Sequence, residues 1–237
     1  MAEAETTTPP AQPGRAGQHQ RTSEFLLSRF EKAVLPRLAG ALPRAIKPDH
    51  LTILGLVAST GIAAGYMLTN HSPHWLWAVS GLLVVQWFGD SLDGTLARVR
   101  HAERPRYGYY LDHITDAYST LAIGLGLGFS PYMLLSVGLA IVVSYLILSV
   151  NVYLETHVFG EFSFSYGRLG PTEVRVLLIL LNTAVFFGAA LPFHLLGAGA
   201  TIFDVFGIAA ALAMLGLLLG RVARNLRRLG RMEPPRA

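Results

Sequence analysis

The stretch GDSLDGTLARVRHAERPRYGYYLDHITD, residues 89–116, contains four of the six aspartates in this 237-residue chain. Asp90 and Asp93 lie at the end of one apolar stretch, and Asp112 and Asp116 lie near the start of the next. A carboxylate inside a membrane-spanning segment costs about 3 kcal/mol or more, so it is normally paired, metal-bound or turned toward a wet cavity. Four such carboxylates in one short segment therefore predict a functional site.

The composition around this stretch is that of a polytopic membrane protein, because 52% of the residues are hydrophobic and only 14% are charged. The chain has no cysteine, so any metal must be held by oxygen or imidazole ligands, which favours Mg²⁺ or Mn²⁺. The net charge of +4 comes mainly from arginines in short polar segments. No basic groove with interleaved aromatic residues is present, and we expect no nucleic-acid partner.

Six apolar stretches can be recognised, and each is close to the roughly 20 residues that a spanning helix needs. Arginines gather after the second and sixth stretches and at the start of the fifth, whereas the other three connections contain no Lys or Arg. By the positive-inside rule, both termini and the aspartate stretch are cytoplasmic. We therefore predict an all-α, integral membrane protein of a bacterial-type inner or cell membrane, with six transmembrane helices at about 51–69, 75–97, 107–129, 132–154, 174–193 and 202–220.

The segments before and after these helices differ in character. Residues 1–20 are predicted to be a disordered tail, and residues 21–46 an amphipathic helix in the membrane interface, with a short helix that covers the bundle as the alternative. The catalytic domain is expected at 47–225, followed by a basic cytoplasmic tail at 226–237 that contacts anionic membrane lipids.

Three glycines in the third stretch, Gly124, Gly126 and Gly128, superficially resemble a dinucleotide-binding fingerprint. They lie inside an apolar span with no preceding strand, which is the wrong context for that fingerprint. Close packing of this helix against its neighbours is the better interpretation.

Helical geometry brings the aspartates together. On a helix, Asp90, Asp93, Gly94 and Ala97 share one face about 100° wide. Gly108, Asp112 and Asp116 follow at intervals of four residues on the next helix. Because a short loop makes these two helices antiparallel neighbours, the two faces can meet near the cytoplasmic end.

Four converging carboxylates require either protonation or cations. Two divalent ions would balance their formal charge, and paired metals about 4 Å apart are suited to phosphoryl transfer. The small residues Gly94, Ala97 and Gly108 would let a bulky group approach the backbone. Arg98 is placed to meet a phosphate or a carboxylate.

The pattern Asp90-x-x-Asp93-Gly94-x-x-Ala97-Arg98, followed by Gly108-x-x-x-Asp112-x-x-x-Asp116, resembles the signature of the CDP-alcohol phosphotransferases, also called CDP-alcohol phosphatidyltransferases. Nine residues separate Arg98 from Gly108, where the commonest spacing in that family is eight, and a loop tolerates the difference. The resemblance implies an enzyme of phospholipid biosynthesis that transfers a substituted phosphate from a CDP-linked donor to an alcohol and releases CMP. It also implies a homodimer.

The resemblance further implies roles for particular residues. The metal ligands would be Asp90, Asp93, Asp112 and Asp116, holding two divalent cations, Mg²⁺ or Mn²⁺, with Asp116 also the general base. The nucleotide would be bound by Thr52, Asp90, Gly94, Ala97, Arg98 and Gly108. Asp49 stands near Thr52 where the family commonly has Asn.

The acceptor alcohol is less constrained. His113 and Glu173 resemble residues of the choline and ethanolamine branch, where a His and a Glu assist at the acceptor hydroxyl, and they are our further catalytic candidates. Alternatively, His113 packs as a neutral ring, and Glu173 is favoured at the start of a helix by the helix dipole. Arg168 and Arg175 could instead bind the phosphate of an acceptor such as inositol phosphate or glycerol phosphate, with CDP-diacylglycerol as donor.

Two other classes of protein need consideration. A divalent-cation transporter could also carry intramembrane aspartates, but the first, fourth and sixth spans contain almost no charge and the four aspartates gather at one end. A degenerate family member with only a structural role should have a damaged motif, whereas every named position is present here.

Overall fold

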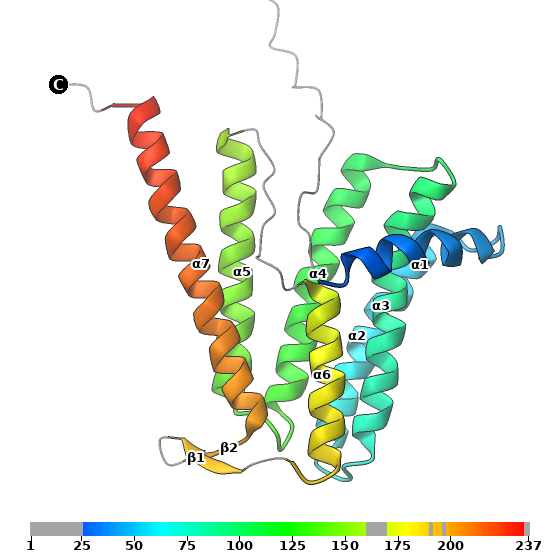
Figure 1. Ribbon diagram of the computed structural model, residues 1–237, viewed down its shortest axis with the longest axis vertical. Coiled ribbons are helices and arrows are strands. Elements are labelled where there is room, and N and C mark those ends of the chain that lie inside the picture. Colours follow the sequence, from blue (N-terminus) through cyan, green and yellow to red (C-terminus); the bar gives the residue numbers. More distant parts are fainter. Residues whose placement is uncertain (1–25, 160–169, 190–191, 196–197, 235–237) are drawn as a thin grey trace, which may run out of the picture.

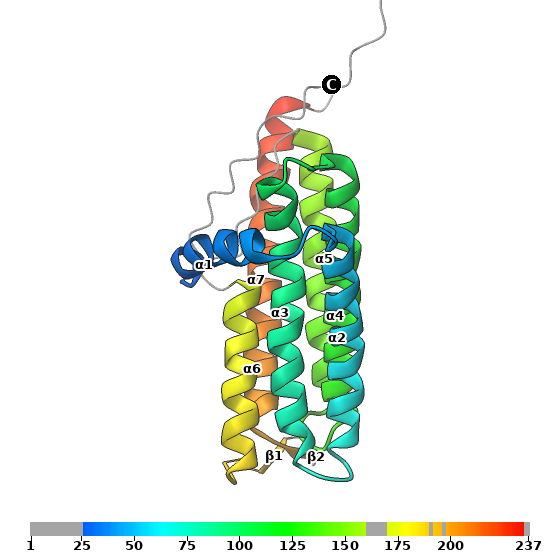
Figure 2. The same ribbon diagram turned by 90° about the vertical axis from the view of Figure 1, so that its right-hand side faces the viewer.

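The computed structural model describes residues 26–159, 170–189, 192–195 and 198–234. Within these residues the chain is mostly helical, with seven helices and one antiparallel two-stranded hairpin. Six helices run alongside one another, and the first lies across them (Figures 1 and 2). The tail predicted at 1–20 and the candidate Arg168 lie outside the described residues. The elements are α1 (Ser28–Ala41), α2 (Pro48–Leu68), α3 (Trp75–Val99), α4 (Pro105–Gly128), α5 (Leu135–Phe159), α6 (Pro171–Phe186), β1 (Phe193–Leu195), β2 (Ala198–Ala200) and α7 (Ile202–Met232).

Three of the described helices, α2, α5 and α7, are long and apolar enough to cross a membrane by length and composition. Helices α3 and α4 have 25 and 24 residues, but they carry the charged aspartate stretch, and α6 has only 16 residues. Proline occupies the first position of α2, α4 and α6, where its fixed φ suits a helix start and its missing N–H is not needed. The predicted helices therefore exist, although composition alone marks only three as spans.

The last two helices differ in length from the prediction. Helix α6 ends at Phe186 rather than near Phe193, because Gly188 adopts a φ of 93° that ends the helix. The apolar residues that follow form the β1–β2 hairpin, with Phe193 opposite Ala200. Helix α7 runs beyond Gly220 to Met232, because its arginine-rich end consists largely of good helix formers and contains no proline before Pro234.

Helices α2, α3 and α4 form the closely packed part of the molecule. A Cβ added to Gly89 of α3 would lie 2.6 Å from the Leu51 carbonyl oxygen and 2.7 Å from the Gly55 nitrogen, so α2 and α3 touch through their backbones beside Asp90. In the same way, a Cβ on Gly126 of α4 would lie 2.5 Å from the Cα of Ala63. The predicted packing role of the glycines in this helix is confirmed.

Helices α5 and α7 form a second unit that is joined near both ends. The fully buried Asp204 of α7 accepts hydrogen bonds from the backbone N–H of Leu134 (2.8 Å) and of Thr201 (2.7 Å). At the other end, Arg221 of α7 forms a buried ion pair with Glu155 of α5, at 2.7 Å. Figure 1 shows this pair of helices diverging from the rest toward the end that carries the carboxyl terminus.

Helix α1 lies roughly at right angles to the other helices, across the end of the bundle that contains the α3–α4 loop (Figures 1 and 2). It buries Leu35 and Ala39 against Leu92 and Leu96 of α3. The connection from α1 to α2 is held by Arg100, which donates to the carbonyls of Leu42 and Pro43, both at 3.0 Å, and of Ile46. A helix, Ser28–Ala41, thus lies within the range predicted at 21–46, of which residues 21–25 are outside the described residues, and it packs on the segment of α3 that carries the aspartates.

Candidate active site

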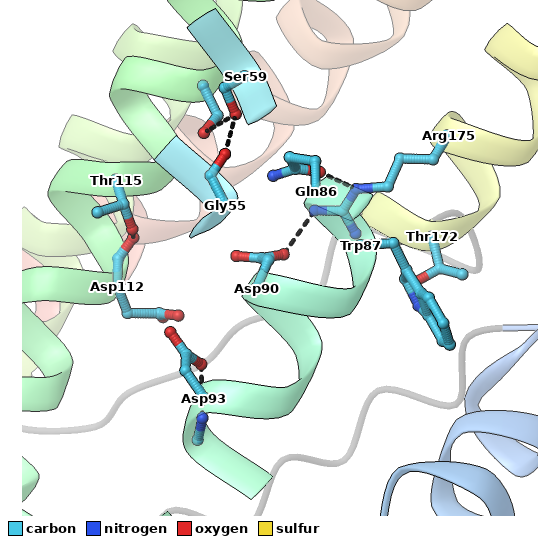
Figure 3. A network of polar contacts seen from close by, with 12 residues as sticks. Gly55, Ser59, Gln86, Trp87, Asp90, Asp93, Asp112, Thr115, Thr172 and Arg175 are labelled. Atoms are coloured by element: carbon cyan, nitrogen blue, oxygen red, sulfur yellow. Dashed lines mark hydrogen bonds and ion pairs between the residues drawn. The ribbon is translucent and has the colours of Figure 1, made fainter. Parts of the chain in front are cut away.

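Asp93 of α3 and Asp112 of α4 point their carboxylates toward each other (Figure 3). Asp93 is fixed in this direction by two donors: Thr52 Oγ1 of α2 lies 2.7 Å from Oδ2, and the Gly94 N–H lies 2.5 Å from Oδ1. Thr52 is buried, and we predicted it as a residue of the nucleotide pocket. In the structure its hydroxyl donates to a predicted metal ligand, and its role toward a nucleotide stays a prediction.

Asp90 lies one turn before Asp93 and binds a different partner. Its Oδ2 atom is 2.5 Å from Arg175 Nη2 of α6, and Arg175 Nε donates to Gln86 Oε1 at 2.5 Å. In Figure 3 one Asp90 oxygen faces Arg175 and the other points toward α4, where Asp112 lies. Arg175 is only 8% exposed, and its Nη1 atom is buried without a hydrogen-bond partner in the described part of the chain.

A small cavity lies behind these aspartates, between α2, α3 and α4. Its volume is about 10 Å³, roughly the space that one water molecule needs. Six of its eight lining residues are polar, so the cavity suits a water molecule. It is lined by Thr52, Gly55, Leu56, Gln86, Asp90, Asp93, Thr115 and Ser119.

Four of the six residues predicted to bind the nucleotide lie at the open end of the site. Gly94, Arg98 and Gly108 are exposed, and Ala97 is half-buried. A Cβ on Gly108 would meet no atom within 4 Å, and one on Gly94 would meet only the flexible end of Arg98, at 3.6 Å. Arg98 donates to Thr95 Oγ1 at 3.0 Å. This end of α3 and α4 therefore has open space beside the aspartates.

Asp49 lies at the edge of the same end, in the first turn of α2. It forms an exposed ion pair with Arg104 from the α3–α4 loop. Hydrogen bonding to Asp49 raises the pKa of the Arg104 guanidinium. The contact joins the loop to α2 without involving the four motif aspartates.

The remaining catalytic candidates lie in two different places. Asp116 is half-buried one turn beyond Asp112 on α4. His113 packs between Tyr109 and Tyr153, at ring-centroid distances of 4.1 and 5.3 Å, with Nδ1 at 2.7 Å from the Tyr109 carbonyl and 3.6 Å from Asp112 Oδ2.

Glu173 is at the start of α6, and both of its oxygens accept backbone N–H groups: Leu27 at 2.7 Å and Gly170 at 2.9 Å. The structure therefore places His113 beside the aspartates and gives Glu173 a role at the junction of α1 and α6.

The aspartates provide the right type of ligand for a hard cation, because all their donors are carboxylate oxygens. Within the described ranges, however, no three or more carboxylate or imidazole side chains come together as a ready metal-binding group. Asp93 and Asp112 already face each other, and like charges at such sites recruit cations or protons. The residues thus fit a divalent cation by their chemistry.

Among the residues of this site that sequence reasoning missed are Gln86 and Thr115. Gln86 stands one turn before Asp90 in an otherwise apolar stretch, which is a signal that could have identified it. Thr115 bonds the Asp112 carbonyl at 2.9 Å and lines the cavity, but threonine is too common within apolar helices to be noticed from sequence.

The chain was compared with known proteins. The sequence model of the CDP-alcohol phosphatidyltransferase family matches residues 45–222. A phosphatidylinositol phosphate synthase of Cutibacterium acnes (strain DSM 16379 / KPA171202) is 34% identical over 96 residues, which cover 39% of this chain and 43% of that protein. The chain thus matches less than half the length of this curated relative.

Proposed function

Because the chain belongs to the CDP-alcohol phosphatidyltransferase family, we propose that it transfers a substituted phosphate group from a CDP-linked donor to an alcohol and releases CMP, in phospholipid biosynthesis. The observation that carries this proposal is the pair of facing carboxylates, Asp93 and Asp112, beside open space at Gly94 and Gly108. A site of this kind can accept a diphosphate with its associated cations and leave room for the base and ribose.

In the proposed reaction the acceptor oxygen forms a bond to the phosphorus that carries the alcohol or lipid group, and the bond from that phosphorus to the CMP oxygen breaks. Asp116 would take the hydroxyl proton as general base. Arg98, with Gly94, Ala97 and Gly108, would bind the cytidine and diphosphate. Two divalent cations, Mg²⁺ or Mn²⁺, would be held by Asp90, Asp93, Asp112 and Asp116, and when bound they would neutralise the charge on the leaving CMP.

The membrane arrangement is also part of the proposal. Helices α2–α7 would be the six spans of the 47–225 domain, with α1 in the cytoplasmic interface and the active site on the same side. The length and apolar character of α2, α5 and α7 support integration into the membrane. The basic end of α7 would contact anionic lipid, since Arg224, Arg227, Arg228 and Arg231 line one hollow of about 540 Å³. Homodimerisation follows from the family alone.

For the acceptor we propose a phosphorylated polyol, such as inositol phosphate, with CDP-diacylglycerol as donor. The similarity to a protein named phosphatidylinositol phosphate synthase supports this choice. The buried, unpartnered Nη1 atom of Arg175 provides a donor suited to a phosphate oxygen near Asp90. The alternative, an unphosphorylated alcohol assisted by His113 and Glu173, has less support, because both Glu173 oxygens are engaged by backbone N–H groups.

The test is incubation of the purified protein with a panel of CDP-linked donors and alcohols, scored by CMP formation and product mass. We expect Mg²⁺- or Mn²⁺-dependent CMP release with CDP-diacylglycerol and a phosphorylated polyol. CMP release only with an unphosphorylated alcohol would overturn the acceptor assignment. Metal flux into liposomes without CMP release from any donor would refute the enzyme proposal and favour a transporter.

A further inference from the structure

Glu31 of α1 binds two other helices at once. Its Oε1 atom accepts from Trp87 Nε1 of α3 at 3.1 Å and from Thr172 Oγ1 of α6 at 2.5 Å. Four residues earlier, the Leu27 N–H donates to Glu173 of α6. The first turn of α1 is therefore tied to the first turn of α6. We call the four residues Leu27, Glu31, Thr172 and Glu173 the α1–α6 strap.

The strap lies next to the contact that orients Asp90. Arg175 follows Glu173 by two residues on α6, and Trp87 lies between Gln86 and Asp90 on α3. In Figure 3, Trp87 and Thr172 lie beside the Arg175–Asp90 ion pair. The hydrogen bonds of Glu31 to Trp87 and Thr172, and that of Leu27 to Glu173, are thus within about one turn of that ion pair.

Helix α6 is short, with 16 residues, and packs on α3. On the other side of α3, Leu35 and Ala39 of α1 pack against Leu92 and Leu96, which alternate with Asp90 and Asp93 along the helix. Helix α1 thus supports the back of the aspartate segment and, through the strap, the start of α6.

We propose that Glu31 is a positioning residue: by holding the first turn of α6 it keeps Arg175, which also donates to Gln86, on Asp90, so that the second oxygen of Asp90 stays directed at α4. Glu31 acts through Thr172 and Arg175 and does not touch substrate. A ligand that is held in one direction binds a cation more tightly than one that rotates, which is the usual effect of groups that support metal ligands. This inference rests on the proposed metal site. It adds α1 to the helices that position the aspartates.

The experiment compares Glu31→Ala with Glu31→Gln in the full chain, purified in mild detergent. Mn²⁺ affinity is measured by electron paramagnetic resonance, and CMP release gives kcat. We expect Glu31→Ala to weaken Mn²⁺ binding and to lower kcat, each about tenfold. Glu31→Gln should stay within about twofold of wild type, because its amide oxygen still accepts from Trp87 and Thr172. Lys32→Ala, an exposed change on the same helix turn, is the matched control.

A double-mutant cycle separates positioning from a general loss of structure. In an Arg175→Met background, Glu31→Ala should change Mn²⁺ affinity by less than about twofold, because the residue through which it acts is gone. The proposal would be overturned if Glu31→Ala weakened Mn²⁺ binding as much in the Arg175→Met protein as in wild type. It would also be overturned if Glu31→Ala and Lys32→Ala bound Mn²⁺ with equal affinity.

Hydrogen exchange tests the strap without any metal. Peptides covering residues 171–180 should exchange faster in Glu31→Ala than in wild type and at wild-type rate in Glu31→Gln. Unchanged exchange in Glu31→Ala would refute the strap even if the protein proved to bind no Mn²⁺. Failure of wild-type Mn²⁺ binding and CMP release would instead refute the proposed function, and the exchange result would still decide the strap.

Discussion

Two polar clusters lie among the apolar helices of this protein, and their charges are balanced in different ways. Between α5 and α7, Glu155 accepts hydrogen bonds from Arg221, from Asn151 at 2.7 Å and from Asn225 at 2.6 Å. Between α3 and α4, the Asp93 carboxylate faces the Asp112 carboxylate. The first cluster contains the cation that its carboxylate needs. The second has Arg175 bound to Asp90, but two of its carboxylates, Asp93 and Asp112, face each other.

This difference separates a structural from a functional carboxylate more reliably than burial does. Glu155 is the more buried of these groups, yet it has a complete set of protein partners, so its role is to join two helices. Asp93 and Asp112 face each other with like charge, and such pairs recruit cations or protons. The predictions below test whether the two clusters respond to substitution as differently as their surroundings suggest.

The largest effect is expected for Asp112→Asn. Removing one of two facing carboxylates should lower CMP release by about a thousandfold or more, because a cation ligand is lost. The thermal unfolding midpoint should stay the same or rise, since a like-charge contact is relieved. Asp49→Asn, which removes an exposed carboxylate bound to Arg104, is the control and should keep nearly full activity. A large drop in the thermal unfolding midpoint of Asp112→Asn would instead indicate that the aspartate cluster has a structural role.

Glu155→Ala should give the opposite pattern. It leaves Arg221 buried without its counter-ion, and we expect the free energy of unfolding to fall by about 3–5 kcal/mol, measured by denaturant unfolding in detergent. The double substitution Glu155→Leu with Arg221→Leu should recover most of this loss, because neither charge remains buried. If the double variant were as unstable as Glu155→Ala, the ion pair would not be the cause.

The contact between α2 and α3 gives a third test. Gly89→Ala places a methyl group against the backbone of Leu51 and Gly55, so the helices must separate beside Asp90, at a cost of about 1–3 kcal/mol. The matched control is Gly81→Ala on the same helix, where an added Cβ meets no atom within 4 Å and should stabilise slightly. Equal unfolding midpoints for the two variants would show that the close approach is unimportant.

The smallest effect is expected for Thr52→Val, which removes one hydrogen bond from Asp93 and keeps the shape of the side chain. Activity should fall about tenfold, with a higher Mg²⁺ requirement, because the carboxylate is no longer held. Thr60→Val on the same helix loses bonds to Leu56 and Tyr118 instead and should be nearly neutral. Equal activities for these two variants would show that the hydroxyl of Thr52 does not contribute to the site.

Much of the site could be predicted from the sequence because its main residues are close along the chain. The spacing of Asp90, Asp93 and Asp112 is enough to put them on facing helices, and the structure brings Asp93 and Asp112 together. The contacts of these residues were not predictable, since Thr52 of α2 and Arg175 of α6 meet Asp93 and Asp90 only through tertiary packing.

The contacts at the starts of α1 and α6, and the end of α6, were also not predictable from the sequence. Hydrogen bonds join residue 27 to residue 173 and residue 31 to residue 172, and no local sequence pattern predicts them. For Glu173, the position at the start of a helix suggests the capping contact that it makes with Gly170, and its catalytic role stays a prediction. The early end of α6 depends on the backbone conformation of Gly188 within a run of apolar residues, where hydropathy continues to favour a span.

The most direct test of the central claim is the number of Mn²⁺ ions bound by the purified protein at saturation with CMP present. Electron paramagnetic resonance should detect two bound ions in wild type, fewer in Asp112→Asn, and again two in Glu155→Gln. No bound Mn²⁺ in wild type, or equal binding by wild type and Asp112→Asn, would contradict the claim that the facing aspartates form a metal-dependent catalytic site.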